Sequence, residues 1–341
     1  MATIKDIAKI SGVSYPTVSH VLNRTRDVSP KTQKKVFDAI NKLGYIPNGV
    51  ARGLRRSRMN TIGVVFPFPV TSFFTTHCYG PIVDGIMVGA QSHKQTAMFY
   101  VAEHYPDIPE SLQQYCDGRS DGLVVIGQRT NLPFVAALKA RSYPFVCVTE
   151  AWEDSGVPYV DAMQSQLASG LLDHFVSLGH RRIAILPGRE AEINVQQRLI
   201  GTNEGLDRHG LSREECPISF GNYDPQSGYD RTRDLFQDSK PGSRPTAILC
   251  FNDHLAWGAL AALADLGLKC PEDVSVAGID DSPPSVSSNP PLTSMRLPLH
   301  EIGEQAISVL IDVINGEPRD IAHRNIPGEL IVRQSTAPPN S

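Results

Sequence analysis

From Thr61 onward, short apolar runs bounded by turn residues alternate with amphipathic segments. The apolar runs cover residues 61–67, 96–102, 122–127, 144–149, 182–188, 246–251 and 274–280. Segments between them, such as 164–178 and 252–266, have apolar residues at helical spacing. Buried parallel strands form continuous apolar runs, and a helix that joins two parallel strands makes a right-handed crossover. The pattern predicts an α/β core with enough strands for two doubly wound parallel sheets.

The first 46 residues have a helical pattern instead. Thr3 can cap one helix, Gly12 lies where the chain must turn sharply, and Ser14 can cap a second helix. The inward positions are Ile4, Ile7, Ala8, Val18, Val21 and Leu22, and the outward positions near the start of the second helix are Tyr15, Pro16, Thr17, Ser19 and His20. Helix-turn-helix units place the second helix in the major groove of DNA. The alternative is an ordinary helical hairpin with a solvated polar face.

A third helix is predicted to begin at Ser29-Pro30 and to stop at Gly44. Its apolar stripe consists of Val36, Phe37, Ile40 and Leu43, and its exposed lysines are Lys31, Lys34 and Lys35. Residues 47–60 then form a basic, marginally helical linker, because Gly49 and Gly53 each cost a helix about 1 kcal/mol relative to alanine. Such a segment needs a partner chain or DNA to order it.

These patterns divide the chain into a helix-turn-helix domain (1–46), a hinge (47–60), a two-lobed core (61–337) and a tail (338–341). A polar segment at 152–161 marks a boundary between lobes, and the segments after Pro290-Pro291 are expected to cross back. We therefore predict an N-lobe of about 61–160 plus 290–325 and a C-lobe of about 161–289 plus 326–337.

Charge is distributed unevenly along the chain. Residues 1–60 contain six lysines and six arginines against three aspartates and no glutamate, a net charge of +9, although the whole chain carries −4. A basic segment on an acidic body indicates a polyanion-binding module attached to a part that does not bind polyanions. A solvated charged face would explain the many charges but not the scarcity of acids.

Other features exclude several classes of protein. The six cysteines lie far apart, with no spacing that would close a zinc site, so we expect reduced, mostly buried thiols and no bound metal or cofactor. No export signal and no run of about 18 apolar residues is found, which favours a cytoplasmic protein. Phosphate-loop, nucleophile-elbow and zinc-protease motifs are missing, which argues against an enzyme. We interpret His180 and His254 as turn and cap residues rather than as catalytic bases.

The order of these features resembles the LacI/GalR family of bacterial transcription regulators over essentially the whole chain. The segments that carry the resemblance at the front are TIKDIAKISGVSYPTVSHVLN, VSPKTQKKVFDAINKLGYIPN and VARGLR. Further on they are DGLVVIG, SLGHRRIAILPG, RPTAILCFND, PEDVSVAGIDD and PPLTSMRLP. The resemblance implies a small all-α helix-turn-helix domain and a core like the periplasmic sugar-binding proteins.

The resemblance also implies roles in DNA binding. Base or groove contacts are expected from Tyr15, Pro16, Thr17, Ser19, His20 and Leu54, and phosphate contacts from Thr3, Ser14, Asn23, Lys31, Lys34, Arg52 and Arg55. Pro16 can supply only apolar contact, because it has no polar side-chain group, and its alternative role is to preorganise the first helical turn. Leu54 matches the hinge leucine that wedges into the minor groove. Its alternative is a partly buried helix residue.

A second set of residues is expected to bind an effector. It comprises Phe73, Phe74, Thr149, Arg198, Tyr223, Asn252, Asp253 and Asp280. Arg198 and Asp280 are expected to face each other across a cleft, where a guanidinium and a carboxylate can bind neighbouring hydroxyls. The alternatives are structural: Asn252 or Asp253 only caps a helix, Arg198 is a surface pair, Asp280 closes a turn, and the aromatic residues belong to the core.

The predicted function is that of a DNA-binding transcription regulator that acts as a repressor and forms a homodimer or a tetramer. It is expected to bind a near-palindromic operator under allosteric control by a small metabolite, such as a sugar or sugar derivative, held between the lobes. The alternative is a solute-binding receptor of the periplasmic type without DNA function, which predicts an export signal and no basic head. The sequence leaves open the effector, the operator and the direction of control.

Overall fold

The structure is a computed structural model. It describes residues 2–23, 25–46, 53, 58–66, 79–100, 108–127, 133–149, 156–237, 239, 242, 244–317 and 323–340. The chain divides into two compact units, Met1–Met59 and Asn60–Ser341. The predicted ends of the helix-turn-helix domain, the hinge and the tail stay a prediction.

Three helices form the N-terminal unit: α1 (Ile4–Ser11), α2 (Tyr15–Asn23) and α3 (Pro30–Leu43). The predicted helix ends are confirmed. The Thr3 hydroxyl accepts from the amide of Asp6, the Ser29 side chain caps α3, and Gly12 and Gly44 have left-handed φ angles of 67° and 57°. The buried core of the unit is Ile7, Val18, Val21, Val36 and Ala39.

One predicted core position of α3 is wrong. Phe37 is 46% exposed, while Val36 and Ala39 are buried. Residues three apart share a helix face, whereas Phe37 is rotated by about 100° from Val36. The inward stripe of α3 therefore runs through Val36, Ala39, Ile40 and Leu43.

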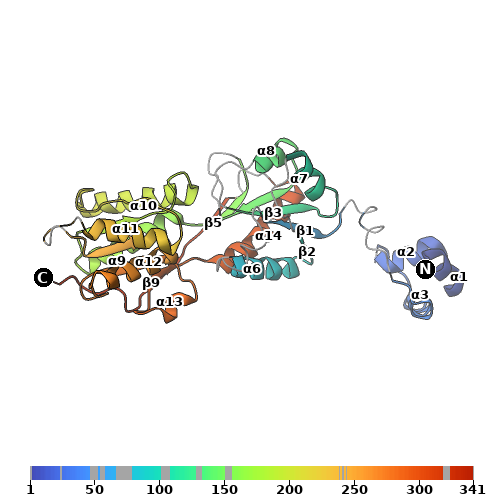
Figure 1. Ribbon diagram of the computed structural model, residues 1–341. Coiled ribbons are helices and arrows are strands. Elements are labelled where there is room, and N and C mark those ends of the chain that lie inside the picture. The colour runs from blue at the N-terminus through green and yellow to red at the C-terminus, as the bar shows by residue number, and fades with distance from the viewer. Residues whose placement is uncertain are drawn as a thin grey trace. The chain divides into compact units, whose positions relative to one another are not determined.

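The N-lobe contains a parallel sheet in the order β10-β5-β4-β3-β1-β2. Its strands are β1 (Thr61–Val65), β2 (Thr96–Tyr100), β3 (Gly122–Ile126), β4 (Phe145–Val148), β5 (Tyr159–Ala162) and β10 (His323–Ile326). On one face lie α6 (Tyr79–Ser92) and α14 (Leu299–Asn315), and on the other α7 (Ile108–Tyr115) and α8 (Pro133–Ala140) (Figure 1). Successive strand residues face opposite helix layers, so Val64 packs with α6 and α14 and Val65 packs with α7 and α8.

The C-lobe contains a second sheet in the order β11-β9-β8-β7-β6. Its strands are β6 (Ile183–Leu186), β7 (Ala247–Cys250), β8 (Ser275–Asp280), β9 (Thr293–Arg296) and β11 (Glu329–Ile331), of which only β11 is antiparallel. One face is covered by α9 (Gln164–Ser177) and α10 (Ile193–His209), and the other by α11 (Pro225–Gln237) and α12 (Asp253–Asp265). A short helix, α13 (Pro284–Ser287), follows β8. The two sheets confirm the predicted doubly wound α/β core.

The lobe boundary at the C-terminal end needs correction. Residues 290–325 were expected in the N-lobe, but β9 pairs with β8 in the C-lobe sheet, with Ala277 opposite Thr293. The chain therefore crosses between lobes after Ala162, after Arg296 and after Ile326. The crossings after Arg296 and after Ile326 lie close together. A Cβ atom added at Gly328 would lie 2.6 Å from the Arg296 carbonyl oxygen.

Buried polar residues connect the C-terminal segment to the C-lobe. The ring of His180 contacts the Thr246 hydroxyl at 2.9 Å and the Ala337 carbonyl oxygen at 2.9 Å. This supports the structural interpretation of His180.

Five cysteines are free thiols, as predicted; the sixth, Cys78, lies outside the described residues. No helix in the described part of the chain is long and apolar enough to cross a membrane.

Close packing of α6 on α14 gives a test of the N-lobe architecture. A Cβ at Gly85 would overlap the carbonyl oxygen of His300, whereas a Cβ at Gly80, in the same helix, would meet nothing within 4 Å. We expect Gly85→Ala to lower the free energy of unfolding by about 1–3 kcal/mol, because the two backbones must separate. Gly80→Ala should change it by less than about 0.5 kcal/mol. Urea unfolding of both variants measures the difference, and equal stabilities would contradict this packing.

Candidate functional site

The second helix presents its N-terminal end to solvent. Tyr15 and Pro16 are exposed, Tyr15 at 47%, while Thr17, Ser19 and His20 are half-buried. The Ser14 hydroxyl accepts from the Thr17 amide at 3.3 Å, which confirms the predicted cap. Nδ1 of His20 lies 2.8 Å from the Thr25 hydroxyl, so the ring is held in place. The exposed apolar ring of Tyr15 and the adjacent polar groups form a face that can enter a groove.

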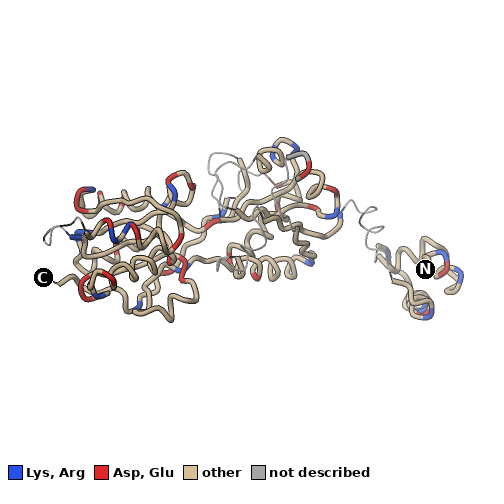
Figure 2. The backbone as a smooth tube through the Cα atoms, in the orientation of Figure 1, with Lys and Arg blue, Asp and Glu red and all other residues tan. Residues whose placement is uncertain are grey.

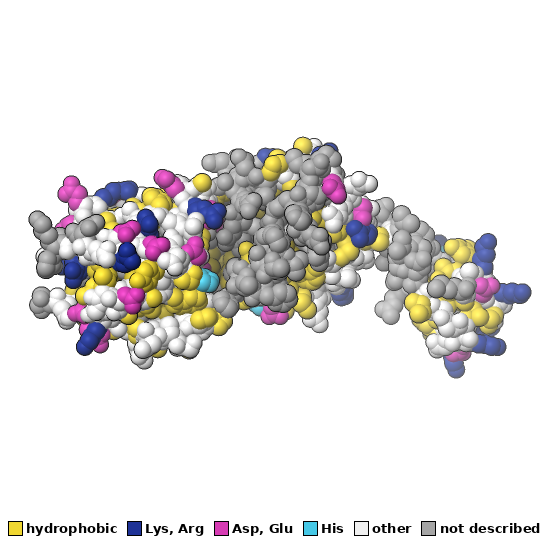
Figure 3. Space-filling view, in the orientation of Figure 1, with side chains coloured by type: hydrophobic (Ala, Val, Ile, Leu, Met, Phe, Trp, Pro, Cys, Tyr) yellow, Lys and Arg dark blue, Asp and Glu magenta, His cyan; other side chains and the backbone are white. Residues whose placement is uncertain are grey.

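The other residues expected to contact DNA are partly described. Lys31 and Lys34 are exposed in the first half of α3, and Thr3 is exposed at the start of α1. Figure 2 marks the lysine and arginine positions of the unit in blue, and Figure 3 shows such side chains projecting from its surface. The Asn23 amide donates to the Ser19 carbonyl oxygen at 2.8 Å, which stabilises the end of α2. Arg52, Leu54 and Arg55 lie outside the described residues.

A cavity of about 880 Å³ lies between the N-lobe and the C-lobe. Four of the predicted effector residues, Arg198, Tyr223, Asn252 and Asp280, line it from the C-lobe, and Thr149 lines it from the N-lobe. Phe73 and Phe74 lie outside the described residues. The structure thus brings together five of the eight predicted effector residues.

Arg198, from α10, is the most deeply buried cation of the cavity. It is 3% exposed, and its Nε donates to the Gln164 side-chain oxygen at 2.8 Å. Another N–H donates to the Phe251 carbonyl oxygen. Both acceptors are neutral, and no carboxylate of the described residues lies within ion-pair distance of the guanidinium. A buried charge held only by neutral groups can gain a strong charge-assisted bond from a ligand.

Arg198 and Asp280 were expected on opposite sides of the cleft, and this expectation is wrong. Both belong to the C-lobe, because Asp280 ends β8 and α10 packs against the same sheet. The opposing wall comes from the N-lobe and includes Tyr79, Asp161, Leu299 and His300. A ligand would therefore be bound by the C-lobe groups and covered by the other lobe.

Asp280 is held in an unusual conformation and environment. Its φ is 135° and that of Asp281 is 54°, a region that non-glycine residues adopt only under strain. Burial raises the pKa of the Asp280 carboxyl to about 8, the neighbouring Asp253 adds to the rise, and Arg198 opposes it. This rise in pKa favours the protonated form of Asp280, which can donate a hydrogen bond.

Tyr223 packs directly on Gly188, where any side chain would overlap its ring. Burial raises the pKa of its hydroxyl well above the usual value, and the Arg198 cation partly offsets this. Thr149, with a left-handed φ of 65°, donates its hydroxyl proton to the Gly127 carbonyl oxygen at 3.2 Å. Its oxygen can still accept from a ligand.

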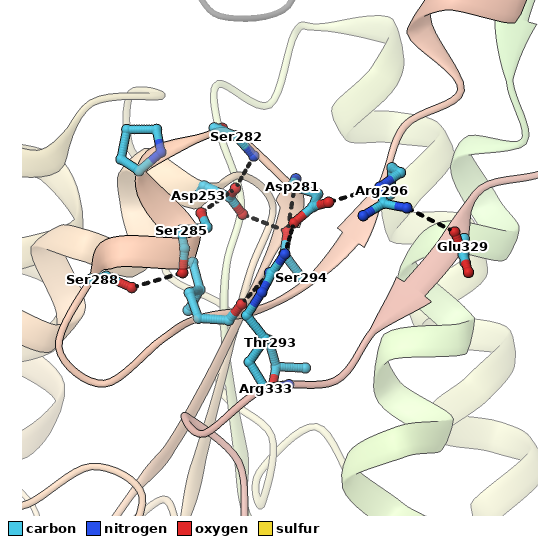
Figure 4. A network of polar contacts seen from close by, with 12 residues as sticks. Asp253, Asp281, Ser282, Ser285, Ser288, Thr293, Ser294, Arg296, Glu329 and Arg333 are labelled. Atoms are coloured by element: carbon cyan, nitrogen blue, oxygen red, sulfur yellow. Dashed lines mark hydrogen bonds and ion pairs between the residues drawn. The ribbon is translucent and has the colours of Figure 1, made fainter.

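Asn252 and Asp253 have separate roles. Asn252 lines the cavity and also caps α12, since its side-chain oxygen accepts from the Leu255 amide at 2.8 Å. Asp253 was expected to contact the effector, but it is fully buried and does not line the cavity. Its carboxylate accepts from the Ser282 amide at 2.8 Å and from the hydroxyls of Ser285 at 2.7 Å and Ser294 at 2.6 Å (Figure 4). It supports the loop after Asp280 instead.

Several lining residues were missed by the sequence analysis, among them Tyr79, Asp161, Gln164, Asn194, His254, Arg296 and His300. Asp161 and Arg296 lie at or near the carboxyl ends of β5 and β9, the edge at which open α/β sheets bind ligands. That rule could have found them had these strands been predicted. Within the described ranges, no group of three or more His, Cys, Asp or Glu side chains could hold a metal ion.

The comparisons with known proteins agree with this architecture. Residues 3–48 match the model described as "Bacterial regulatory proteins, lacI family", and residues 172–336 match a periplasmic binding protein-like domain. The repressor PurR of Haemophilus influenzae is 30% identical over 345 residues, covering 98% of each chain. Catabolite control protein A of Priestia megaterium is 30% identical over 336 residues, covering 98% of this chain and 99% of its own.

Two solved structures extend the likeness. The lac repressor dimer bound to operator and the anti-inducer ONPF superimposes with a TM-score of 0.82 at 26% identity, over 98% of this chain and 99% of that one. The complex of the regulator CelR with cellobiose superimposes with a TM-score of 0.72 at 28% identity, over 98% of this chain and 100% of that one.

A helix-turn-helix unit joined to a two-lobed binding core defines a DNA-binding transcription regulator. The chain belongs to the lacI family of bacterial regulatory proteins. The relatives named above are regulators rather than enzymes.

The raised pKa of Asp280 predicts how stability depends on pH. The Asp280 carboxyl has a pKa of about 8 in the folded protein, whereas an aspartate in the unfolded chain has a pKa of about 4. Stability from the neutral carboxyl is therefore complete below pH ~4 and is lost as pH rises through the folded pKa. Asp280→Asn should raise the melting temperature at pH 8 and change it little at pH 5. Asp230→Asn, on α11, should have the same small effect at both values. A constant effect of Asp280→Asn across this range would contradict the assignment.

Proposed function

We propose that the protein is a transcription repressor that binds duplex DNA as a homodimer in the cytoplasm under the control of a small polar effector. The effector is a sugar or sugar derivative bound between the lobes. The observation that carries this proposal is the buried Arg198, which faces an 880 Å³ cavity and bonds only neutral acceptors. A cavity of this volume suits a small molecule.

The polar groups of the cavity suit a hydroxylated ligand. Arg198, Asn194, Asn252 and the protonated Asp280 offer donors on one wall, and the Asn side-chain oxygens offer acceptors. Apolar contact is available from Leu299 and Pro298 on the other side. Relatives with solved structures are described with ligands of this class, namely cellobiose in CelR and ONPG in the lac repressor.

DNA recognition is assigned to α2. Tyr15, Pro16 and His20 are proposed to contact base edges, and Thr17 and Ser19 the groove walls. The groups proposed to bind phosphates are Thr3, Ser14, Asn23, Lys31 and Lys34, to which the undescribed Arg52 and Arg55 are added, with Leu54 as the minor-groove wedge. A dimer related by a twofold axis requires a near-palindromic operator.

Effector binding is connected to the lobe crossings by hydrogen bonds. Gln164 accepts from Arg198 and donates to the Asp161 carboxylate at 3.0 Å, so the first crossing is joined to the effector site. Arg296 ends β9 at the second crossing and lines the same cavity. A ligand that favours one arrangement of the crossings shifts the population of the DNA-competent state by its differential affinity.

Operator binding under a ligand panel tests the proposal. A duplex is first selected from a randomised pool with the full chain, and its binding is followed by fluorescence anisotropy with neutral sugars, sugar phosphates and sugar acids. At least one compound should shift the affinity for DNA. Arg198→Met should weaken ligand binding, measured by its effect on DNA affinity, about 10–100-fold, because one or two charge-assisted bonds are lost. DNA binding without ligand should be kept.

The matched control is Arg189→Met, because Arg189 is exposed and bonds Asn222 outside the cavity. It should respond like the wild type. If no compound shifts DNA binding, or if Arg198→Met responds as well as Arg189→Met, the proposed effector site is wrong.

A further inference from the structure

A second guanidinium, that of Arg296, reaches the cavity at the crossing between lobes. Its Nε donates to Asp281 Oδ2 at 2.8 Å and another N–H donates to Glu329 Oε2 at 3.1 Å (Figure 4). Arg296 is also among the residues that line the cavity, and its side chain is 49% exposed. It is therefore fixed by two carboxylates and still accessible to a ligand.

The fold does not require this charge. Asp281, whose side chain is 6% exposed, already has a partner in Arg333, which is 14% exposed and donates to its other oxygen at 2.5 Å and to the Leu292 carbonyl oxygen at 2.7 Å. The second partner of Arg296, Glu329, is 68% exposed. Exposed ion pairs contribute little to stability. Removal of the Arg296 guanidinium would thus leave no buried charge without a partner.

The geometry leaves a binding edge. A guanidinium has five N–H donors in a rigid planar fork, and the described residues accept from only two of those on Arg296. The two carboxylates orient the plane of the guanidinium before a ligand arrives. Less conformational entropy of the Arg296 side chain is therefore lost when the ligand binds. A planar fork held in this way matches the oxygens of a phosphate or a carboxylate.

Five carboxyl groups also line the cavity, those of Asp161, Asp224, Asp280, Asp281 and Glu301, and the negative charge of two of them is reduced. Asp281 is paired with two arginines, and burial raises the pKa of Asp280 to about 8. Asp161 accepts from the Ala162 amide at 2.7 Å and from Gln164 at 3.0 Å, and Asp224 accepts from the Ser227 amide at 2.8 Å, but these donors are neutral and leave the negative charges in place. Arg198, by contrast, has no carboxylate partner within the described residues. The positive charge that an anionic group could approach is therefore concentrated at Arg198 and Arg296.

We propose that the effector carries an anionic group, a phosphate or a carboxylate, and that Arg296 binds this group at the lobe crossing. Arg198, Asp280 and Asn252 then hold the hydroxylated part of the same molecule. This inference rests on the proposed function and narrows its effector to sugar phosphates or sugar acids. It also places the anionic group where the chain passes between the lobes. Binding of this group would therefore change the relative stability of the open and closed arrangements of the lobes.

Calorimetric titration of the full-length protein tests the inference. The probes are hexoses and pentoses, each supplied as the neutral sugar, its terminal phosphate and its terminal carboxylate. At least one anionic form should bind about 10-fold or more tightly than its neutral parent, and the difference should shrink as salt is raised. Tighter binding of the phosphate alone identifies a sugar phosphate, and tighter binding of the carboxylate alone identifies a sugar acid.

Substitutions assign the preference to Arg296. Arg296→Met should reduce the affinity for the anionic form to that of the neutral parent and leave the neutral parent within about twofold of wild type. Glu329→Gln, which removes a competing negative charge, should keep or increase the preference. Arg324→Met is the control, because Arg324 is exposed on β10 and does not line the cavity. Thermal unfolding of each variant establishes that it is folded.

The outcomes separate the two proposals. If neutral sugars bind as tightly as their phosphates and acids, or if Arg296→Met weakens both forms equally, the inference is wrong and the proposed function stands. If no sugar in any form binds, the inference and the proposed effector class both fail.

Discussion

The proposed effector site depends on one buried carboxylate, that of Asp253. It is fully buried, yet it accepts three hydrogen bonds of 2.6–2.8 Å, from the Ser282 amide and from the hydroxyls of Ser285 and Ser294. These donors belong to the loop after β8, to α13 and to β9, so one group holds the strained loop, with Asp280 at φ 135°, against the strand that leads to the crossing. An ion cannot be buried without such partners.

Holding Asp280 in place makes the cavity chemically unusual. Burial and the nearby Asp253 favour the neutral acid at Asp280, while Arg198 remains charged among neutral acceptors. Such an arrangement is costly for the empty protein, and a ligand with matching polar groups offsets that cost. The same groups reach the lobe crossings through Gln164 and Arg296, so binding and lobe arrangement share hydrogen bonds.

Local features could be predicted from the sequence because neighbouring residues determine them. Helix caps at Thr3 and Ser29 and the seven apolar strands are of this kind. Features that depend on contacts between residues far apart in the chain could not be predicted from the sequence. The lobe that contains β9 depends on its pairing with β8, and the role of Asp253 depends on serines about 30 to 40 positions away. Arg296 was missed for the same reason, since nothing beside it in the chain marks an arginine that shares Asp281 with Arg333.

The central claim is that the N-terminal unit binds DNA and that the core binds only the small molecule. An electrophoretic mobility shift with a selected duplex compares the full chain with a protein of residues 60–341, the compact second unit. The account predicts strong retardation by the full chain, weakening steeply with salt, and an affinity at least about 100-fold lower for the core alone. Equal retardation by a folded core would contradict it.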